Sequence, residues 1–151
     1  MIETRPGEDA VVASAFALVE IDAVKQVRAD EKVFTAGEEA YARAKRDPER
    51  RLAARLAAKQ AAQRLLGGGA GLGEIEVARG RYGPPVLRLS GIAKERMADL
   101  GASATLVSLT HERLHAAAVV MLLRTEPAGG RTPWPRTRSR HGDRVLGGEE
   151  G

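Results

Sequence analysis

The chain has no cysteine, and aromatic residues make up only 3% of its 151 residues. Without cysteine it cannot form disulfides, use a thiolate nucleophile or hold zinc through sulfur ligands. The scarcity of aromatic side chains argues against binding of single-stranded nucleic acid, because proteins of that class stack bases on aromatic platforms. We therefore disfavour a single-stranded nucleic acid as the partner, and a nucleic-acid binder driven by basic charge alone ranks behind the other functions considered below.

Long apolar runs are also missing, and none approaches the roughly 20 residues that a membrane-spanning helix requires. The first residues, MIETRPGEDAVV, lack the basic and then apolar order of a secretory signal. These two absences predict a chain that does not enter a membrane and that works in the cytoplasm.

The charge balance is basic, with 24 Lys and Arg residues against 20 Asp and Glu residues and a formal net charge of +4. An excess of positive charge suits an anionic partner, such as a phosphorylated cofactor, an acidic protein or a nucleic acid. The length suits one domain with a core of its own. We expect that domain to cover residues 11–124, with disordered segments at 1–10 and 125–151, the second of which is a basic tail rich in Gly, Pro and Arg.

The pattern of apolar residues predicts an α+β fold. A buried strand is expected in the second half of 11–21. Thr35, with Glu38 three residues later, is typical of a capping box that opens a helix. A long helix is predicted from about Glu49 to Leu66, where its apolar positions recur at helical spacing.

The second half of the domain is predicted to be mostly β structure. Its expected elements are strands at 74–78, 86–89, 105–108 and 115–123 and a helix at 90–100. We therefore expect a small antiparallel sheet packed on the long helix.

One face of the long helix is predicted to be basic. Arg51, Arg55 and Lys59 are four residues apart, so they share a face. Such a face can hold phosphates through bidentate arginine contacts and the point charge of lysine. The alternative is an ordinary solvated surface. Leu52 and Leu56 belong to a thin apolar stripe on the same helix, which fits burial against a neighbouring copy.

His111 stands in the segment Ser-Leu-Thr-His, which is expected to turn between two apolar strands. A histidine at this position can donate a hydrogen bond to a phosphate or act as a base. The alternative is a turn histidine without a ligand. His115 is expected to be structural, and the three histidines have no spacing typical of a metal site.

Five segments occur in the order typical of one known family. They are AFALVEID at 15–22, Phe34-Thr35 with Glu38-Glu39, RLAAKQA at 55–61, a strand, Gly-x-Pro turn and strand at 75–90, and VSLTHE at 107–112. Together they resemble the holo-acyl-carrier-protein synthase family, the small 4′-phosphopantetheinyl transferases. The resemblance covers about 15–123 and implies the 4′-phosphopantetheinyl transferase-like fold for nearly all of the predicted domain.

The resemblance also implies an activity. Enzymes of this family move phosphopantetheine from coenzyme A to a serine of a carrier protein, using magnesium held by an Asp of the first strand and the Glu of a Lys-Glu-Ala signature. Here those positions are Ala17 and Gln60, and the lysine one turn later, the usual candidate for assisting deprotonation, is Arg64. Magnesium prefers carboxylates, and arginine stays protonated. We therefore expect no metal ligand of the family type and the loss of the original magnesium-dependent transfer.

The positions that hold the ligand are kept. Arg55, Lys59, Ser108 and His111 match residues that contact the phosphates of coenzyme A in the family. The resemblance therefore implies coenzyme A or phosphopantetheine as ligand, an acyl carrier protein as partner, and a homotrimer with the coenzyme site between subunits.

Two functions follow from the resemblance. In the first, the chain binds an acyl carrier protein or its phosphopantetheine arm in polyketide or fatty-acid biosynthesis. It would then be a scaffold, or an enzyme of the cyclase or dehydratase type in which His111 and Glu112 act as acid and base. In the second, it is an active, divergent transferase with Arg64 at the family's lysine position. We favour the first, because three groups of one centre are replaced.

Overall fold

The computed structural model describes residues 10–67, 69–79 and 83–125. Its strands are Ala10–Glu20 (β1), Ile75–Arg79 (β2), Pro85–Leu89 (β3), Ala104–His111 (β4) and His115–Arg124 (β5). Its helices are Val24–Arg28 (α1), Ala36–Arg43 (α2), Pro48–Leu66 (α3) and Gly91–Asp99 (α4), with short 3₁₀ turns at Ile21–Ala23 (η1) and Leu72–Glu74 (η2). Apart from Ala10 and Thr125, the segments predicted to be disordered lie outside the described residues.

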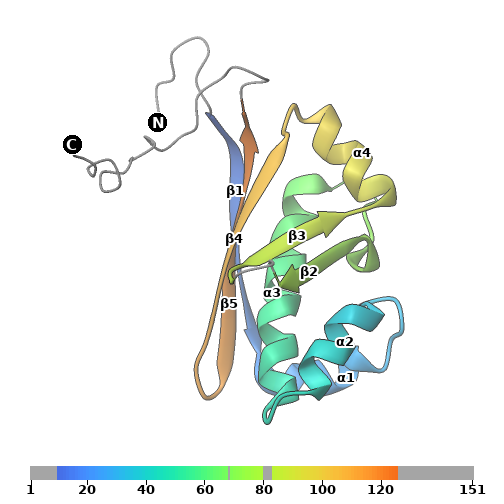
Figure 1. Cartoon of the computed structure of the whole chain (residues 1–151), viewed down its shortest axis with the longest axis vertical. Helices are drawn as coiled ribbons and strands as arrows, with labels where there is room; N and C mark the ends of the chain where they lie inside the picture. Colours follow the sequence, from blue (N-terminus) through green and yellow to red (C-terminus); the bar gives the residue numbers. More distant parts are fainter. Residues whose placement is uncertain (1–9, 68, 80–82, 126–151) are drawn as a thin grey trace, which may run out of the picture.

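The strands form two antiparallel sheets. In the larger sheet β5 lies in the centre, with β1 at one edge and β4 at the other. The smaller sheet is a pairing of β2 with β3 alone. Figure 1 shows α3 lying along the larger sheet, with β2 and β3 crossing over it. The α+β fold with a small antiparallel sheet packed on a long helix is therefore confirmed, although the strands divide into two sheets.

Helix α3 is the centre of the core. Pro48 occupies its first turn, where the missing N–H costs nothing, and the alanines that follow favour helix strongly. Leucines and alanines around most of the circumference are buried against β1, β4, β5 and β2. The prediction of a thin apolar stripe that packs against a neighbouring copy is wrong. The alanines are buried as fully as the leucines, and the strands of the same chain cover them.

Two local predictions have opposite outcomes. The capping box is confirmed, because Thr35 Oγ1 accepts from the backbone N–H of Glu38 while the Glu38 carboxylate accepts from the N–H of Thr35. The placement of His111 in a turn is wrong. Strand β4 continues through His111, where it still pairs with Ala116 of β5, so the turn begins only at Glu112.

The larger sheet has an inner and an outer face. Ala17 of β1 points inward and is buried, whereas its neighbours Phe16 and Leu18 point outward and are 56% and 59% exposed. Leu106 of β4 and Val119 of β5 are exposed on the same side as Phe16. These four side chains give the outer face an apolar patch, beside the exposed polar side chains of Ser108 and Thr110. In the described part of the chain, no helix has the length and apolar character to cross a membrane.

Candidate functional site

A cavity of about 250 Å³ opens where α2 and α3 meet the β2–β3 pair and the end of β4. Its polar walls are Tyr41, Arg51, Arg55, Arg79 and His111. We call this cavity the cationic pocket. Three arginines and a histidine around one space, with no carboxylate among the described residues that line it, make it complementary to an anion.

Arg55 is the most deeply placed of these cations. Its side chain is 4% exposed, and its guanidinium carbon lies 4.0 Å from the centre of the Tyr41 ring. Within the described residues, the buried Nε of Arg55 has no hydrogen-bond partner. Burial lowers the pKa of Arg55, with Tyr41 and Glu38 opposing, yet a guanidinium remains charged at neutral pH. A buried donor left unpaired costs free energy. Arg55 also lines the pocket, so its guanidinium adds positive charge to the space where an anion can bind.

Tyr41 is surrounded by positive charge. Lys45 Nζ lies 5.0 Å from the centre of its ring, and the Arg79 guanidinium carbon lies 5.9 Å from it. Burial alone would raise the pKa of the Tyr41 phenol, but a hydrogen bond with Arg79 and the nearby charges of Arg55, Lys45 and Arg51 outweigh it and lower the pKa. The ring thus holds Arg55 on one side by cation–π attraction and supplies a hydroxyl to the pocket.

His111 closes the pocket from the end of β4. Its pKa is lowered by burial and by the positive charges of Arg51 and Arg50, which Asp47 opposes only in part. Because its pKa lies below the ordinary value, the free imidazole is neutral at pH 7. A bound anion would favour the protonated form.

Lys59 does not reach the cationic pocket. It is fully buried, with its Nζ 2.6 Å from Glu38 Oε1, and Glu38 Oε2 accepts from the N–H of Val77 at 2.7 Å. Burial lowers the pKa of Lys59, while the Glu38 carboxylate opposes that shift. This ion pair joins α3 to α2 and β2. The predicted basic face is therefore divided, because Arg51 and Arg55 line the pocket whereas Lys59 lies in the core. The alternative, an ordinary solvated surface, is wrong.

Ser108 and Glu112 also lie apart from the pocket. Ser108 is exposed on the outer face opposite Val119, because side chains alternate along β4. Glu112 accepts from the N–H of Leu114 and pairs with Nδ1 of His115 at 2.9 Å. The hydrogen bond with His115 lowers the pKa of Glu112. The structure thus places Glu112 with His115, and His111 with the arginines of the cationic pocket.

Ala17, Gln60 and Arg64 lie towards the other edge of the larger sheet, at β1. Arg64 donates from its guanidinium to the carbonyl of Phe16, next to Ala17 on β1, and Gln60 lies one turn earlier on the same face of α3. Strand β1 is one edge of the larger sheet, and β4, with His111, is the other. Among the described residues, no three His, Asp or Glu side chains gather closely enough to hold a metal ion.

Known proteins identify the family to which this arrangement belongs. The holo-acyl-carrier-protein synthase of Ruminiclostridium cellulolyticum is 35% identical over 116 residues, which cover 70% of this chain and 87% of that protein. This chain belongs to the holo-acyl-carrier-protein synthase family. The predicted resemblance is therefore confirmed. No family model matches the chain.

Solved structures of synthases have the same fold. The Mycobacterium tuberculosis acyl carrier protein synthase is 33% identical, with a TM-score of 0.58 over 75% of this chain and 97% of that chain. The Chronobacterium ammoniagenes synthase, solved as a complex with coenzyme A, is 25% identical, with a TM-score of 0.60 over 78% of this chain and 98% of that chain.

Tyr41 and Arg79 are the pocket residues that sequence reasoning missed. Tyr41 lies on α2 and Arg79 at the end of β2, so only the packing of both elements on α3 brings them to Arg55. No local pattern marks either residue. The one signal available was the scarcity of aromatic residues, which makes a tyrosine beside a basic helix unusual in this chain.

Proposed function

We propose that this chain binds the phosphate groups of coenzyme A, or of the phosphopantetheine arm of an acyl carrier protein, in the cationic pocket. The observation that carries the proposal is the convergence of Arg51, Arg79 and His111 with the buried guanidinium of Arg55 around one cavity. Bidentate arginine contacts are well suited to phosphate oxygens. Membership of the synthase family and the coenzyme A complex of a similar synthase support this choice of phosphate ligand.

We further propose an acyl carrier protein as the partner, in fatty-acid or polyketide biosynthesis. The family is named for that partner, and the net positive charge of this chain suits an acidic protein.

A homotrimer is proposed on the apolar outer face of the sheet, where Phe16 and Leu18 are exposed and where Ser108 would meet a neighbouring copy. Light scattering tests the trimer, and a monomeric mass would overturn it.

In this proposal the chain has lost magnesium-dependent transfer. Magnesium would need oxygen donors, preferably carboxylates, near β1 and α3. Ala17 supplies no donor, Gln60 supplies a neutral amide, and Arg64 brings a guanidinium to the carbonyl beside Ala17. A fixed positive charge disfavours a divalent cation, so these residues do not fit magnesium. His111 and Glu112, which have separate partners, do not support the acid–base pair of a cyclase or dehydratase.

The first test compares binding with transfer. We expect calorimetry with coenzyme A to give the same affinity in magnesium and in chelator. Mass spectrometry of an apo carrier protein incubated with this chain, coenzyme A and magnesium is expected to give no gain of a phosphopantetheine arm. Transfer that a chelator abolishes would instead establish the alternative, an active divergent transferase.

Restoring the carboxylates provides the matched comparison. The double variant Ala17→Asp with Gln60→Glu is expected to create magnesium-dependent transfer, because it returns two oxygen ligands to the centre. Ala17→Asn with Gln60 unchanged has nearly the same side-chain volume without the charge, and we expect it to stay inactive. Equal activity of the two would contradict the role assigned to the missing carboxylates.

The titration of His111 predicts a pH dependence of binding. The pKa of free His111 is lowered, and a bound phosphate would raise it. By linkage, the contribution of His111 to affinity is small at neutral pH and grows as pH falls through the pKa of the complex, then levels off below the pKa of the free protein.

The phosphate of the ligand also titrates, so a variant is needed as reference. We expect the affinity ratio of the native chain to His111→Gln to rise by about threefold to tenfold between pH ~7.5 and ~5.5, which corresponds to a pKa change of up to about one unit. Calorimetry at several pH values measures it. A ratio that is constant with pH would exclude His111 from contact with the phosphate.

A further inference from the structure

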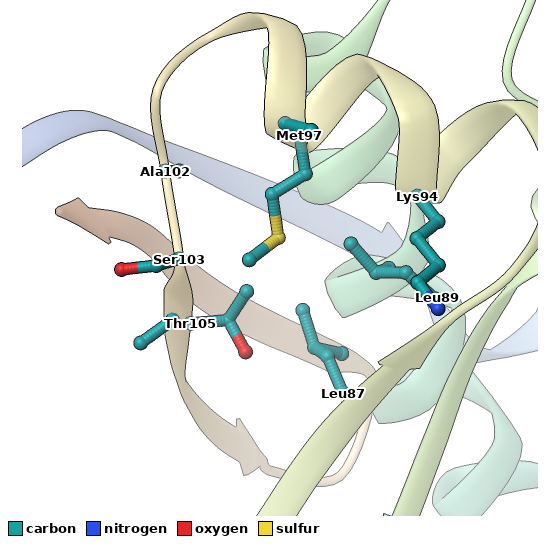
Figure 2. A pocket seen from close by; sticks show the side chains of 9 residues that line it. Leu87, Leu89, Lys94, Met97, Ala102, Ser103 and Thr105 are labelled. Carbon is teal, nitrogen blue, oxygen red and sulfur yellow. The ribbon is translucent and has the colours of Figure 1, made fainter. Parts of the chain in front are cut away.

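A second cavity, of about 380 Å³, lies between β3, α4 and the start of β4. Leu87, Leu89 and Met97 form its apolar walls. Figure 2 shows the side chain of Met97 extending from α4 towards Leu87 and Thr105. We call it the apolar pocket. Among the described residues that line it, Lys94 is the one with an ionisable side chain. Flexible methionine adapts to ligands of different shape, so this cavity suits an apolar chain.

The apolar pocket and the cationic pocket lie along one seam between β3 and β4. On β3, Pro85 lines the cationic pocket, while Leu87 and Leu89 line the apolar one. On β4, Leu109 lines the cationic pocket and Thr105 the apolar one. Alternate residues of a strand share a face, so each strand carries both pockets on the same side. Four residues separate Leu109 from Thr105 on β4 and Pro85 from Leu89, the far wall, on β3, which is about 13 Å at the usual rise; the near wall, Leu87, is two residues from Pro85.

The seam also offers unpaired backbone groups. Strand β4 is an edge of the larger sheet, and β3 pairs only with β2, so in the described residues the two strands have no ladder with each other although they are in contact. Each edge presents N–H and C=O groups without strand partners. An extended ligand that contains amides can pair with such an edge as an added strand does.

We propose that the apolar pocket binds the acyl chain of an acylated phosphopantetheine whose phosphate occupies the cationic pocket. The arm from phosphate to sulfur has about as many backbone bonds as four peptide residues, which is about 13–14 Å when extended. This length matches the four residues between Leu109 and Thr105 on β4 and between Pro85 and the far wall at Leu89 on β3, so the two amides of the arm lie over the seam. The thioester then reaches the apolar pocket. The inference rests on the proposed binding of phosphate and adds the substrate class: acylated rather than free arms.

The test is the dependence of affinity on acyl length. Calorimetry in chelator would compare coenzyme A with its acetyl, butyryl and hexanoyl thioesters. Each methylene that enters the pocket is expected to tighten binding by up to about fourfold, so hexanoyl-coenzyme A, with four more methylenes than the acetyl form, should bind about tenfold to 100-fold more tightly. If coenzyme A binds but neither its thioesters nor the acylated carrier proteins show a dependence on acyl length, the acyl site is excluded and the proposed function stands. If none binds, the proposed function itself fails.

Two variants locate the effect. Ala98 is an exposed alanine of α4 that lines the apolar pocket, so Ala98→Phe fills the cavity with little risk to folding. It is expected to reduce hexanoyl-coenzyme A to the affinity of coenzyme A. Ala29→Phe, at an exposed alanine beyond α1, is the matched control and should keep the dependence on length. A dependence that survives Ala98→Phe would overturn the assignment to this pocket.

An acylated phosphopantetheine arm can come from two sources, a free acyl-coenzyme A and an acylated carrier protein. Titration of the chain with hexanoyl and acetyl carrier protein, beside the two thioesters, distinguishes them. A length effect with both ligands supports a site for the arm from either source. A length effect with the carrier protein alone supports delivery by the protein. The absence of an effect with both excludes the acyl site.

Discussion

Replacement of Arg55 by methionine is expected to weaken coenzyme A binding by about tenfold to 100-fold. Hydrogen bonds to charged groups contribute about 1.5–3 kcal/mol, and Arg55 is the most deeply buried cation of the pocket lining. Arg55→Lys keeps the charge but loses the planar fork, so we expect an intermediate loss. Calorimetry measures the affinities, and thermal melting establishes that each variant is folded.

Arg124 provides the control for charge. It is exposed at the end of β5, far along the larger sheet from the β4 terminus that carries His111. Arg124→Met lowers the net charge as much as Arg55→Met, yet a distant exposed charge is screened and contributes little. Its affinity should stay within about twofold of the native chain. Equal losses for the two variants would mean that binding depends on overall charge and not on the cationic pocket.

The fold could be predicted largely because its information is local. The capping box of Thr35 and Glu38, the helical period of α3 and the alternation along β4 and β5 each lie in a continuous segment. The matches in AFALVEID, RLAAKQA and VSLTHE also preserve the order of the elements. Local patterns of this kind agree with the final fold when a sequence is consistent across levels.

The cationic pocket could be predicted only in part, because it depends on what covers α3. Spacing places Arg51, Arg55 and Lys59 on one face, but it does not reveal that α2 brings Glu38 over Lys59 and Tyr41 over Arg55. Sequence spacing also gave no means of placing Arg79 near the helix, since β2 reaches it only through tertiary packing. The contacts that decide whether a basic residue binds a ligand or a carboxylate are therefore non-local.

The burial of Lys59 leads to the largest expected effect on stability. Lys59 and Glu38 are both fully buried, and the Glu38 carboxylate also accepts from the N–H groups of Thr35 and Val77. Removing one partner of a buried pair leaves the other charge uncompensated, at a cost of about 3–5 kcal/mol. Lys59→Met should therefore lower the free energy of unfolding by that amount, as measured by urea denaturation.

Lys25→Met is the matched control, because Lys25 is exposed on α1 and has no carboxylate partner within the described residues. Its free energy of unfolding should change by at most about 0.5 kcal/mol. The same Lys59→Met protein separates structure from binding. If it folds at low temperature and still binds coenzyme A with native affinity, Lys59 holds α2 and β2 on α3 without touching the ligand. A large loss of affinity in a protein of native stability would instead make Lys59 a phosphate contact, as the family resemblance implies.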